Sequence, residues 1–269
     1  MTTFVTTRDS AQLQVFDSGS GLPVVFQHGL GGDLAQVAAT FPDGPSLRRI
    51  TMECRAHGGS TPGSMRPFRI ATFADDLLAV CDQLGLDRFV LGGISMGAAL
   101  SLHLAVRHRQ RLRGLILARP AWAFTPAPAN MAPFAEVAAC LATLPAAQAH
   151  DAFFASPTAA RLASEAPDNL ASLLRFFERP SPDILTTLLA DIAGDGPDVD
   201  REAARVLDLP TLVIGHGEDF VHPLGLAQDL AAALPRAHLA QIAPKASAPE
   251  RHVHEFRTAV RDFLDTLDP

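Results

Sequence analysis

The sequence Phe89-Val90-Leu91-Gly92-Gly93-Ile94-Ser95-Met96-Gly97-Ala98-Ala99-Leu100 decides how this chain folds. β-Forming residues precede Ser95 and helix-forming residues follow it, which predicts a strand, a tight turn and a helix. Gly93 and Gly97 flank the serine because a strand that reverses so sharply leaves no room for side chains there. The turn would expose the Ser95 hydroxyl and leave the backbone N–H of Met96 free, where it suits a developing oxyanion. The alternative is an ordinary serine in a glycine-rich turn.

The composition indicates one large globular domain. Of its 269 residues 48% are hydrophobic and 19% are charged, enough for one extensive core. A net charge of −7 argues against nucleic acid or an anionic membrane as a partner. The three widely spaced cysteines, Cys54, Cys81 and Cys140, are typical of reduced thiols, and no signal peptide or membrane helix is evident, so we expect a cytoplasmic protein. We expect a small-molecule substrate, no cofactor and no metal. The oligomeric state stays open, with a homodimer among the options.

Short strand patterns alternate with helical patterns in both end regions of the chain. Strands are expected at 2–7, 12–17, 23–27, 47–52, 89–94, 112–117, 211–214 and 237–242, and helices at 72–84, 96–107, 223–234 and 250–267. This alternation predicts an α/β fold with a mostly parallel, doubly wound sheet and ligands beyond the carboxyl ends of the strands. Residues 120–205 lack strand patterns and predict an inserted helical lid between two core segments, 1–119 and 206–269.

Four motifs together resemble the α/β-hydrolase family. They are His28-Gly29-Leu30-Gly31-Gly32, Arg55-x-His57-Gly58-x-Ser60, Gly93-x-Ser95-x-Gly97 and the late Asp219. The resemblance implies that Ser95 is the nucleophile and that the backbone N–H groups of Leu30 and Met96 form an oxyanion hole. Because this fold hosts many reactions, the motifs are more specific for the fold than for the chemistry.

The resemblance also implies an acid and a histidine. Asp219 follows the predicted strand 211–214 and fits the acid, which would fix the tautomer of the imidazole; Glu218 is a weaker candidate. The family places its histidine in the loop after the last strand, where this chain has Ser247. The candidates for the base are then His252, at the start of the last helix, and His222, close to the acid, with His252 preferred. For His252 a place on the surface of an amphipathic helix is the plainer interpretation.

Further residues are candidates for the substrate pocket. His28 and Gly29 lie in the first glycine-rich loop, and His28 is interpreted mainly as structural, with its ring bonded to loop backbone. Arg119, just past a strand, would bind a substrate carboxylate or pair with an acid such as Asp219. Trp122, the only tryptophan, would line an apolar site or pin the lid to the core.

The residues leave several functions open. In the first, Ser95 attacks the carbonyl of a small, largely apolar ester, lactone or thioester, and a histidine backed by Asp219 moves the proton. Lys245 could replace the imidazole in a Ser–Lys pair if burial depressed the pKa of its amine. The missing histidine favours, as the alternative, a non-hydrolytic lyase, isomerase or cyclase that uses Ser95 as a hydrogen-bond donor. The third is a catalytically inactive ligand-binding protein.

Overall fold

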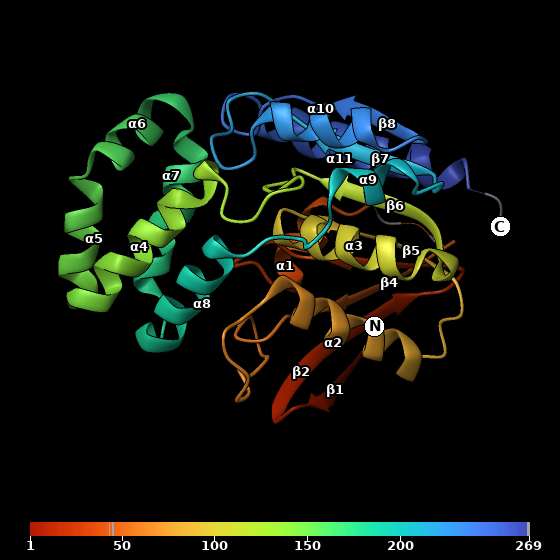
Figure 1. Ribbon diagram of the computed structural model, residues 1–269, viewed down its shortest axis with the longest axis horizontal. Helices are drawn as coiled ribbons and strands as arrows, with labels where there is room; N and C mark the ends of the chain where they lie inside the picture. Colours follow the sequence, from red (N-terminus) through yellow and green to blue (C-terminus); the bar gives the residue numbers. More distant parts are fainter. Residues whose placement is uncertain (43, 45, 268–269) are drawn as a thin grey trace.

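An eight-stranded sheet forms the centre of the computed structural model, which describes residues 1–42, 44 and 46–267 (Figure 1). The strand order is β1-β2-β4-β3-β5-β6-β7-β8. Strand β2 runs antiparallel to its neighbours β1 and β4, and the other pairs are parallel. The strands are β1 (Thr2–Arg8), β2 (Ala11–Gly19), β3 (Leu22–Gln27), β4 (Leu47–Met52), β5 (Phe89–Ile94), β6 (Leu112–Ala118), β7 (Thr211–Gly215) and β8 (Ala237–Gln241). The predicted fold class, including the N-terminal hairpin, is confirmed.

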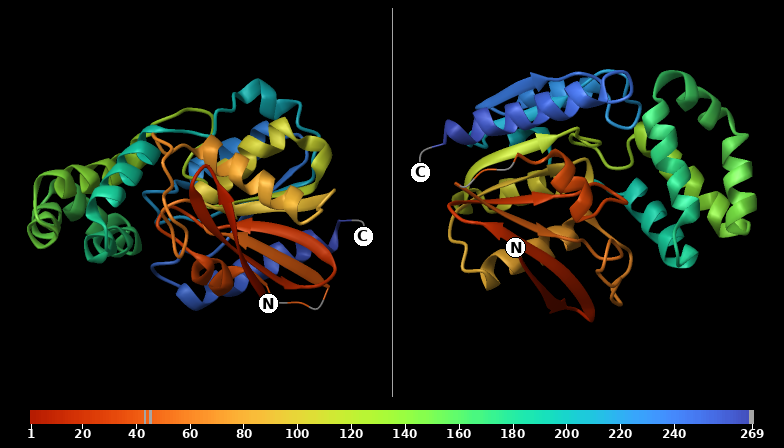
Figure 2. Two further views of the ribbon diagram at one scale, coloured as in Figure 1. Left: turned by 90° about the horizontal axis from the view of Figure 1, so that it is seen from below. Right: turned by 180° about the vertical axis from the view of Figure 1, so that it is seen from behind.

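Helices cover both faces of this sheet, as expected for parallel strands (Figure 2). The core helices are α1 (Leu34–Thr40), α2 (Ile70–Gln83), α3 (Met96–Arg107), α9 (Arg201–Arg205), α10 (Leu224–Ala233) and α11 (Pro249–Asp265). Helices α1 and α11 pack on one face, and α2, α3 and α10 pack on the other. No described helix is long and apolar enough to cross a membrane.

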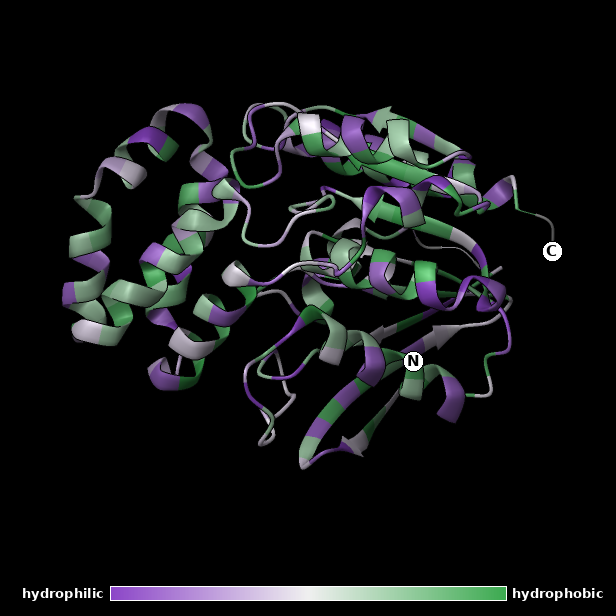
Figure 3. Ribbon diagram, viewed as in Figure 1, coloured by the Kyte–Doolittle hydropathy of each residue, from purple (hydrophilic) through white to green (hydrophobic). Residues whose placement is uncertain are grey.

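The central strands β3, β5, β6 and β7 are almost entirely buried, and Figure 3 shows hydrophobic colouring along much of the visible part of the sheet. Val24 of β3 is in register with Val90 of β5, and both point toward α1 and α11. The next residues, Val25 and Leu91, point toward α2 and α3. Successive residues of a strand face opposite sides, so an unbroken apolar run is what a strand between two helix layers requires. Ser95 directly follows the carboxyl end of β5, so the site lies at this end of the sheet.

A separate group of helices is inserted between β6 and β7 and stands beside the sheet (Figure 2). Its elements are η2 (Ala129–Met131), α4 (Ala132–Thr143), α5 (Ala146–Phe154), α6 (Pro157–Glu165), α7 (Pro167–Leu174), η3 (Arg175–Glu178) and α8 (Pro182–Gly194). Helix α4 packs against α8, whereas α9, also within the range 120–205, packs against α10 of the core. That these helices act as a lid stays a prediction, as do its boundaries.

Candidate active site

Ser95 sits on a strained turn between β5 and α3. Its backbone has φ 57° and ψ −111°, in the left-handed region that side chains rarely occupy. A Cβ atom on Gly93 would lie 2.6 Å from the carbonyl carbon of Gly97, and one on Gly97 would lie 2.6 Å from the oxygen of Gln27. The two glycines are therefore required by close backbone contacts. The Ser95 N–H donates to the carbonyl of Ala118, which anchors the turn to β6 at 2.9 Å.

His222 faces this serine from the loop that follows β7. Its Nε2 lies 2.9 Å from Ser95 Oγ, and its Nδ1 lies 2.9 and 3.0 Å from the two carboxylate oxygens of Asp219. The arrangement fits a neutral imidazole that donates Nδ1–H to Asp219 and accepts the Ser95 hydroxyl proton at Nε2. The structure thus brings together three of the four predicted catalytic residues.

Burial, more than the neighbouring charges, favours the neutral form of His222. Burial lowers the pKa of the imidazole, Asp219 counteracts this, and the Arg119 guanidinium lowers the pKa further. Burial alone would raise the pKa of Asp219, but the adjacent His222 and Arg119 hold it well below its usual value. An ionised acid and a neutral imidazole at neutral pH are the protonation states that general-base catalysis needs.

Arg119 pairs with the acid. Its Nε and Nη2 donate to Asp219 Oδ2 at 3.0 and 2.6 Å, and its Nη2 lies 3.7 Å from Asp168 of α7. Of the two alternatives for this side chain, the structure has the ion pair. Lys245 Nζ lies 3.6 Å from Asp168 Oδ2 with its side chain 40% exposed, so its ammonium also has a carboxylate partner.

The first glycine-rich loop lies directly beside the serine. A Cβ atom on Gly29 would be 3.3 Å from Ser95 Cβ, which places the following residue, Leu30, next to the turn. Met96 is the first residue of α3, and first-turn N–H groups have no acceptor within their own helix. The two amides predicted for an oxyanion hole therefore belong to adjacent segments.

The residues predicted to line the pocket have mainly internal partners. His28 is fully buried, with Nδ1 2.8 Å from the oxygen of Gly29 and Nε2 accepting the N–H of Cys54 at 3.0 Å. Both ring nitrogens are thus used, which agrees with the structural interpretation of His28. Trp122 is 1% exposed and donates its Nε1–H to the oxygen of Asp195 at 2.9 Å. The indole links the two ends of the inserted segment.

The structure does not bring His252, the preferred base, to Ser95. His252 lies in the first turn of α11, and its Nδ1 is 2.9 Å from the oxygen of Ala243. Its ring packs edge-on against His216, with centroids 4.9 Å apart. The expected surface position was also wrong, because His252 is only 3% exposed. The physical reason is that α11 starts with this face turned into the core, where the ring nitrogen pairs with a loop carbonyl.

Sequence and structural comparisons place the chain in a known family. A family model described as the alpha/beta hydrolase fold matches residues 23–246. The chain belongs to the α/β-hydrolase family. It is 27% identical to the 2-hydroxymuconate semialdehyde hydrolase of Pseudomonas putida over 94% of this chain and 90% of that protein.

Solved structures of this family share the architecture. The enol-lactonase of Burkholderia xenovorans LB400 superposes with a TM-score of 0.72 at 23% identity, covering 97% of this chain and 99% of that one. The meta-cleavage product hydrolase of Pseudomonas fluorescens IP01 gives a TM-score of 0.74 at 17% identity, covering 97% of both chains. At these identities the structural likeness establishes the fold. The named hydrolases among the similar proteins support the conclusion that this chain is an enzyme of the family.

Several residues beside this α/β-hydrolase site were not predicted. His216 is buried with Nε2 3.3 Å from Asp219 Oδ2, and Asn169 and Asp168 approach the same loop from α7. The inserted helices carry no recognised motif, so only their packing reveals these contacts. Arg179 donates to the oxygen of Gly31, a contact that spans 148 residues of sequence.

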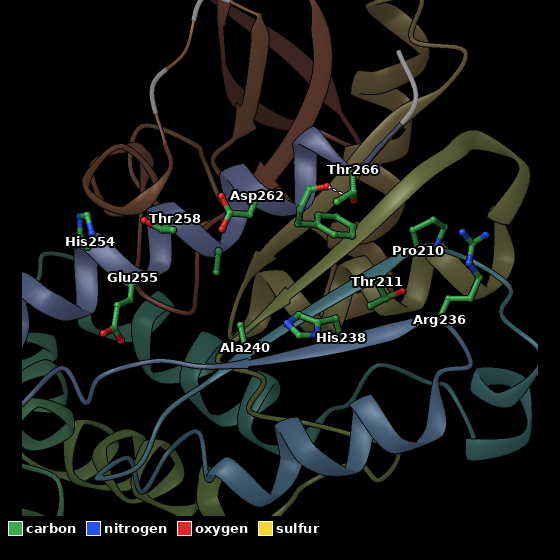
Figure 4. A pocket seen from close by; sticks show the side chains of 12 residues that line it. Pro210, Thr211, Arg236, His238, Ala240, His254, Glu255, Thr258, Asp262 and Thr266 are labelled. Atoms are coloured by element: carbon green, nitrogen blue, oxygen red, sulfur yellow. Dashed lines mark hydrogen bonds between the residues drawn. The ribbon is translucent and has the colours of Figure 1, made fainter.

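Two hollows open on the described surface. One, of about 620 Å³, is lined by Asp219 and its neighbours together with residues of η2 and α6. The other, of about 560 Å³, lies between β8 and α11, and Figure 4 shows His238 and Ala240 on one wall and His254 and Asp262 on the other. None of the three catalytic candidates lines this second groove. Among the described residues no cluster of His, Cys, Asp or Glu side chains is arranged to hold a metal ion.

Proposed function

We propose that this α/β-hydrolase cleaves small, largely apolar esters, lactones or thioesters through an acyl-enzyme on Ser95. The single observation that carries the proposal is the 2.9 Å separation between His222 Nε2 and Ser95 Oγ, with Asp219 bound to the opposite ring nitrogen. A serine hydroxyl alone is a poor nucleophile, and an imidazole held in this way is the group that activates it.

The geometry gives each residue a role in the two half-reactions. Ser95 Oγ attacks the substrate carbonyl carbon while its proton passes to His222 Nε2. The negative charge that develops on the carbonyl oxygen is stabilised by the Leu30 and Met96 N–H groups. The protonated His222 then gives its proton to the leaving oxygen or sulfur. In the second half, His222 takes a proton from water, whose oxygen attacks the acyl carbon. The bond from the acyl carbon to Ser95 Oγ then breaks, the acid product leaves, and His222 returns its proton to Oγ.

The surroundings support an apolar acyl group. Phe176 of η3 packs over the glycine-rich loop, because a Cβ atom on Gly31 would lie 2.5 Å from its ring carbons. Phe134 of α4 packs against Phe176 with ring centroids 5.9 Å apart. An enol-lactonase and a semialdehyde hydrolase among the similar proteins are consistent with small carbonyl substrates. The case for a lyase, isomerase, cyclase or inactive binder relied on a missing imidazole, and His222 weakens it.

A fluorophosphonate probe tests this proposal because it reacts with activated serines. We expect stoichiometric labelling, located on Ser95 by mass spectrometry, together with turnover of short-chain aryl esters or lactones. Ser95→Ala should abolish both, and Ser10→Ala, in an exposed turn, should change neither. An unlabelled Ser95 in a folded protein, with no ester or lactone turned over, would refute the acyl-enzyme mechanism.

A further inference from the structure

The segment that carries both Asp219 and His222 has no regular secondary structure. It follows β7, which ends at Gly215, and precedes α10, which begins at Leu224. Most of its N–H and C=O groups therefore lie outside the strand ladder and the helix, and need other partners when they are buried. Acid and base are only three residues apart, so the conformation of this segment alone decides where the imidazole points.

Two asparagines of the helical insertion bind this segment. Asn169 Oδ1 accepts the N–H groups of Phe220 and Val221, each at 2.9 Å. Asn130 Nδ2 donates to the oxygen of Val221 at 2.6 Å and to that of Ala121 at 2.9 Å. Asn169 is 4% exposed and Val221 3%, so water does not compete freely for these bonds. The backbone between the acid and the base is held from both its donor and its acceptor side.

Asp219 itself binds the last amide of this segment. Asp219 Oδ1 accepts the N–H of His222 at 3.0 Å, so the amides of residues 220, 221 and 222 all have side-chain acceptors. Asp168, next to Asn169 in α7, lies 3.7 Å from Arg119, which binds Asp219. The first turn of α7 thus contacts the backbone of the segment and the cation beside its acid.

We propose that Asn169 is a positioning residue that holds the segment 219–222 so that His222 Nε2 faces Ser95, with Asn130 as the second support. The proposal rests on the function proposed above for Ser95 and His222. It gives the helical insertion a role in aligning the base, besides its predicted role as a lid. The residue touches no reacting atom and acts only through the backbone of Phe220 and Val221.

The first test measures the second-order rate constant for phosphonylation of Ser95 by the fluorophosphonate probe. Asn169→Leu has a similar volume but no acceptor, and we expect the rate constant to fall about 10- to 100-fold, since small misplacements of a catalytic group have effects of this size. Asn169→Asp keeps an acceptor oxygen and should recover most of the loss. Leu173→Ala, at a buried position of the same helix, is the control for general loosening of α7. It should lower the melting temperature and leave the rate constant within about twofold.

The second test does not depend on activity. The imidazole of His222 is titrated by NMR in the wild type and in Asn169→Leu, with its signals assigned from a His222→Asn sample. A released imidazole should titrate closer to an exposed histidine, whereas Leu173→Ala should leave the titration unchanged. An identical titration in wild type and Asn169→Leu overturns the positioning role, whether or not Ser95 reacts. A shifted titration in a protein whose Ser95 is never labelled retains the positioning role and refutes the proposed function.

Discussion

The loops after β7 and β8 leave the sheet at the same edge; the first contains His222, and the second leads into His252 at the start of α11. In the β7 loop, His222 contacts Ser95 and Asp219 through its two ring nitrogens. On the β8 side, His252 binds the oxygen of Ala243, a residue of its own loop. One imidazole is placed to move a proton, and the other satisfies a backbone carbonyl.

The proposed triad of Ser95, His222 and Asp219 depends on positions in space, not on which loop supplies the residue. The family resemblance implies a histidine after the last strand, where this chain has the exposed Ser247. The imidazole comes instead from the loop of the acid, with Asp219 and His222 three residues apart. Serine hydrolases of unrelated folds use the same geometry from different chain orders.

The largest expected effect is the difference in turnover between variants of His222 and of His252. His222→Asn keeps a donor toward Asp219 but removes Nε2, so we expect ester or lactone turnover to fall by about 10⁴-fold. His252→Asn keeps the donor toward Ala243 and should change kcat/KM by no more than about threefold. Steady-state kinetics on folded protein, checked by circular dichroism, measures both. The comparison fails if His252→Asn causes the larger loss.

Stability against pH tests the burial of the histidine on the β8 side. Burial lowers the pKa of six histidines, namely His28, His57, His103, His216, His222 and His252. Below pH 6.5 the unfolded chain therefore binds protons that the folded chain does not, and stability decreases as pH falls. The pKa of His252 is lowered to about 4, so this group alone costs up to about 3 kcal/mol between pH 6.5 and 4.

Urea unfolding between pH 7.5 and 4 measures this slope. We expect His252→Asn to flatten it, because asparagine does not titrate. Leu264→Ala, at a buried apolar position of the same helix, is the control and should lower stability by the same amount at each pH. Equal slopes in wild type and His252→Asn would show that His252 does not resist protonation in the fold.

Removal of the Arg119 charge should change how activity depends on pH, because His222 of the β7 loop titrates beside this cation. This cation lowers the pKa of His222, so Arg119→Gln should raise that pKa and move the acid limb of kcat/KM to higher pH. For Arg119→Gln we expect kcat/KM at pH 5.5 to be roughly threefold to tenfold lower than at pH 8. Arg201→Gln, which removes a pair with Asp229 on α10, is the control. An acid limb that does not move would exclude this influence of Arg119.

The smallest effect is expected from a histidine placed in the β8 loop. Ser247→His in the His222→Asn protein should recover no more than about threefold of the lost turnover, since position 247 is exposed. Recovery to near wild-type turnover would mean that either loop can supply the base.

Sequence reasoning was most successful for segments whose structure is local. The strand and helix around Ser95, the requirement for Gly93 and Gly97, and the alternation of strands with helices were all predicted from adjacent residues. It was least successful for His252, whose direction depends on how α11 packs. It also missed Asn169, because an asparagine after a proline and an aspartate in a short helix has no distinguishing pattern.

The sequence alone therefore determined the α/β fold and the turn at Ser95, because both depend on short-range patterns of glycine, β-formers and periodic apolar residues. The family resemblance supplied the acid candidate Asp219. Only the tertiary structure decided which imidazole meets the serine. That choice depends on the hydrogen bonds of Asn169 and Asn130 to Val221 and its neighbour, which join segments 52 and 91 residues apart. Contacts over such distances arise from packing, which no local pattern encodes.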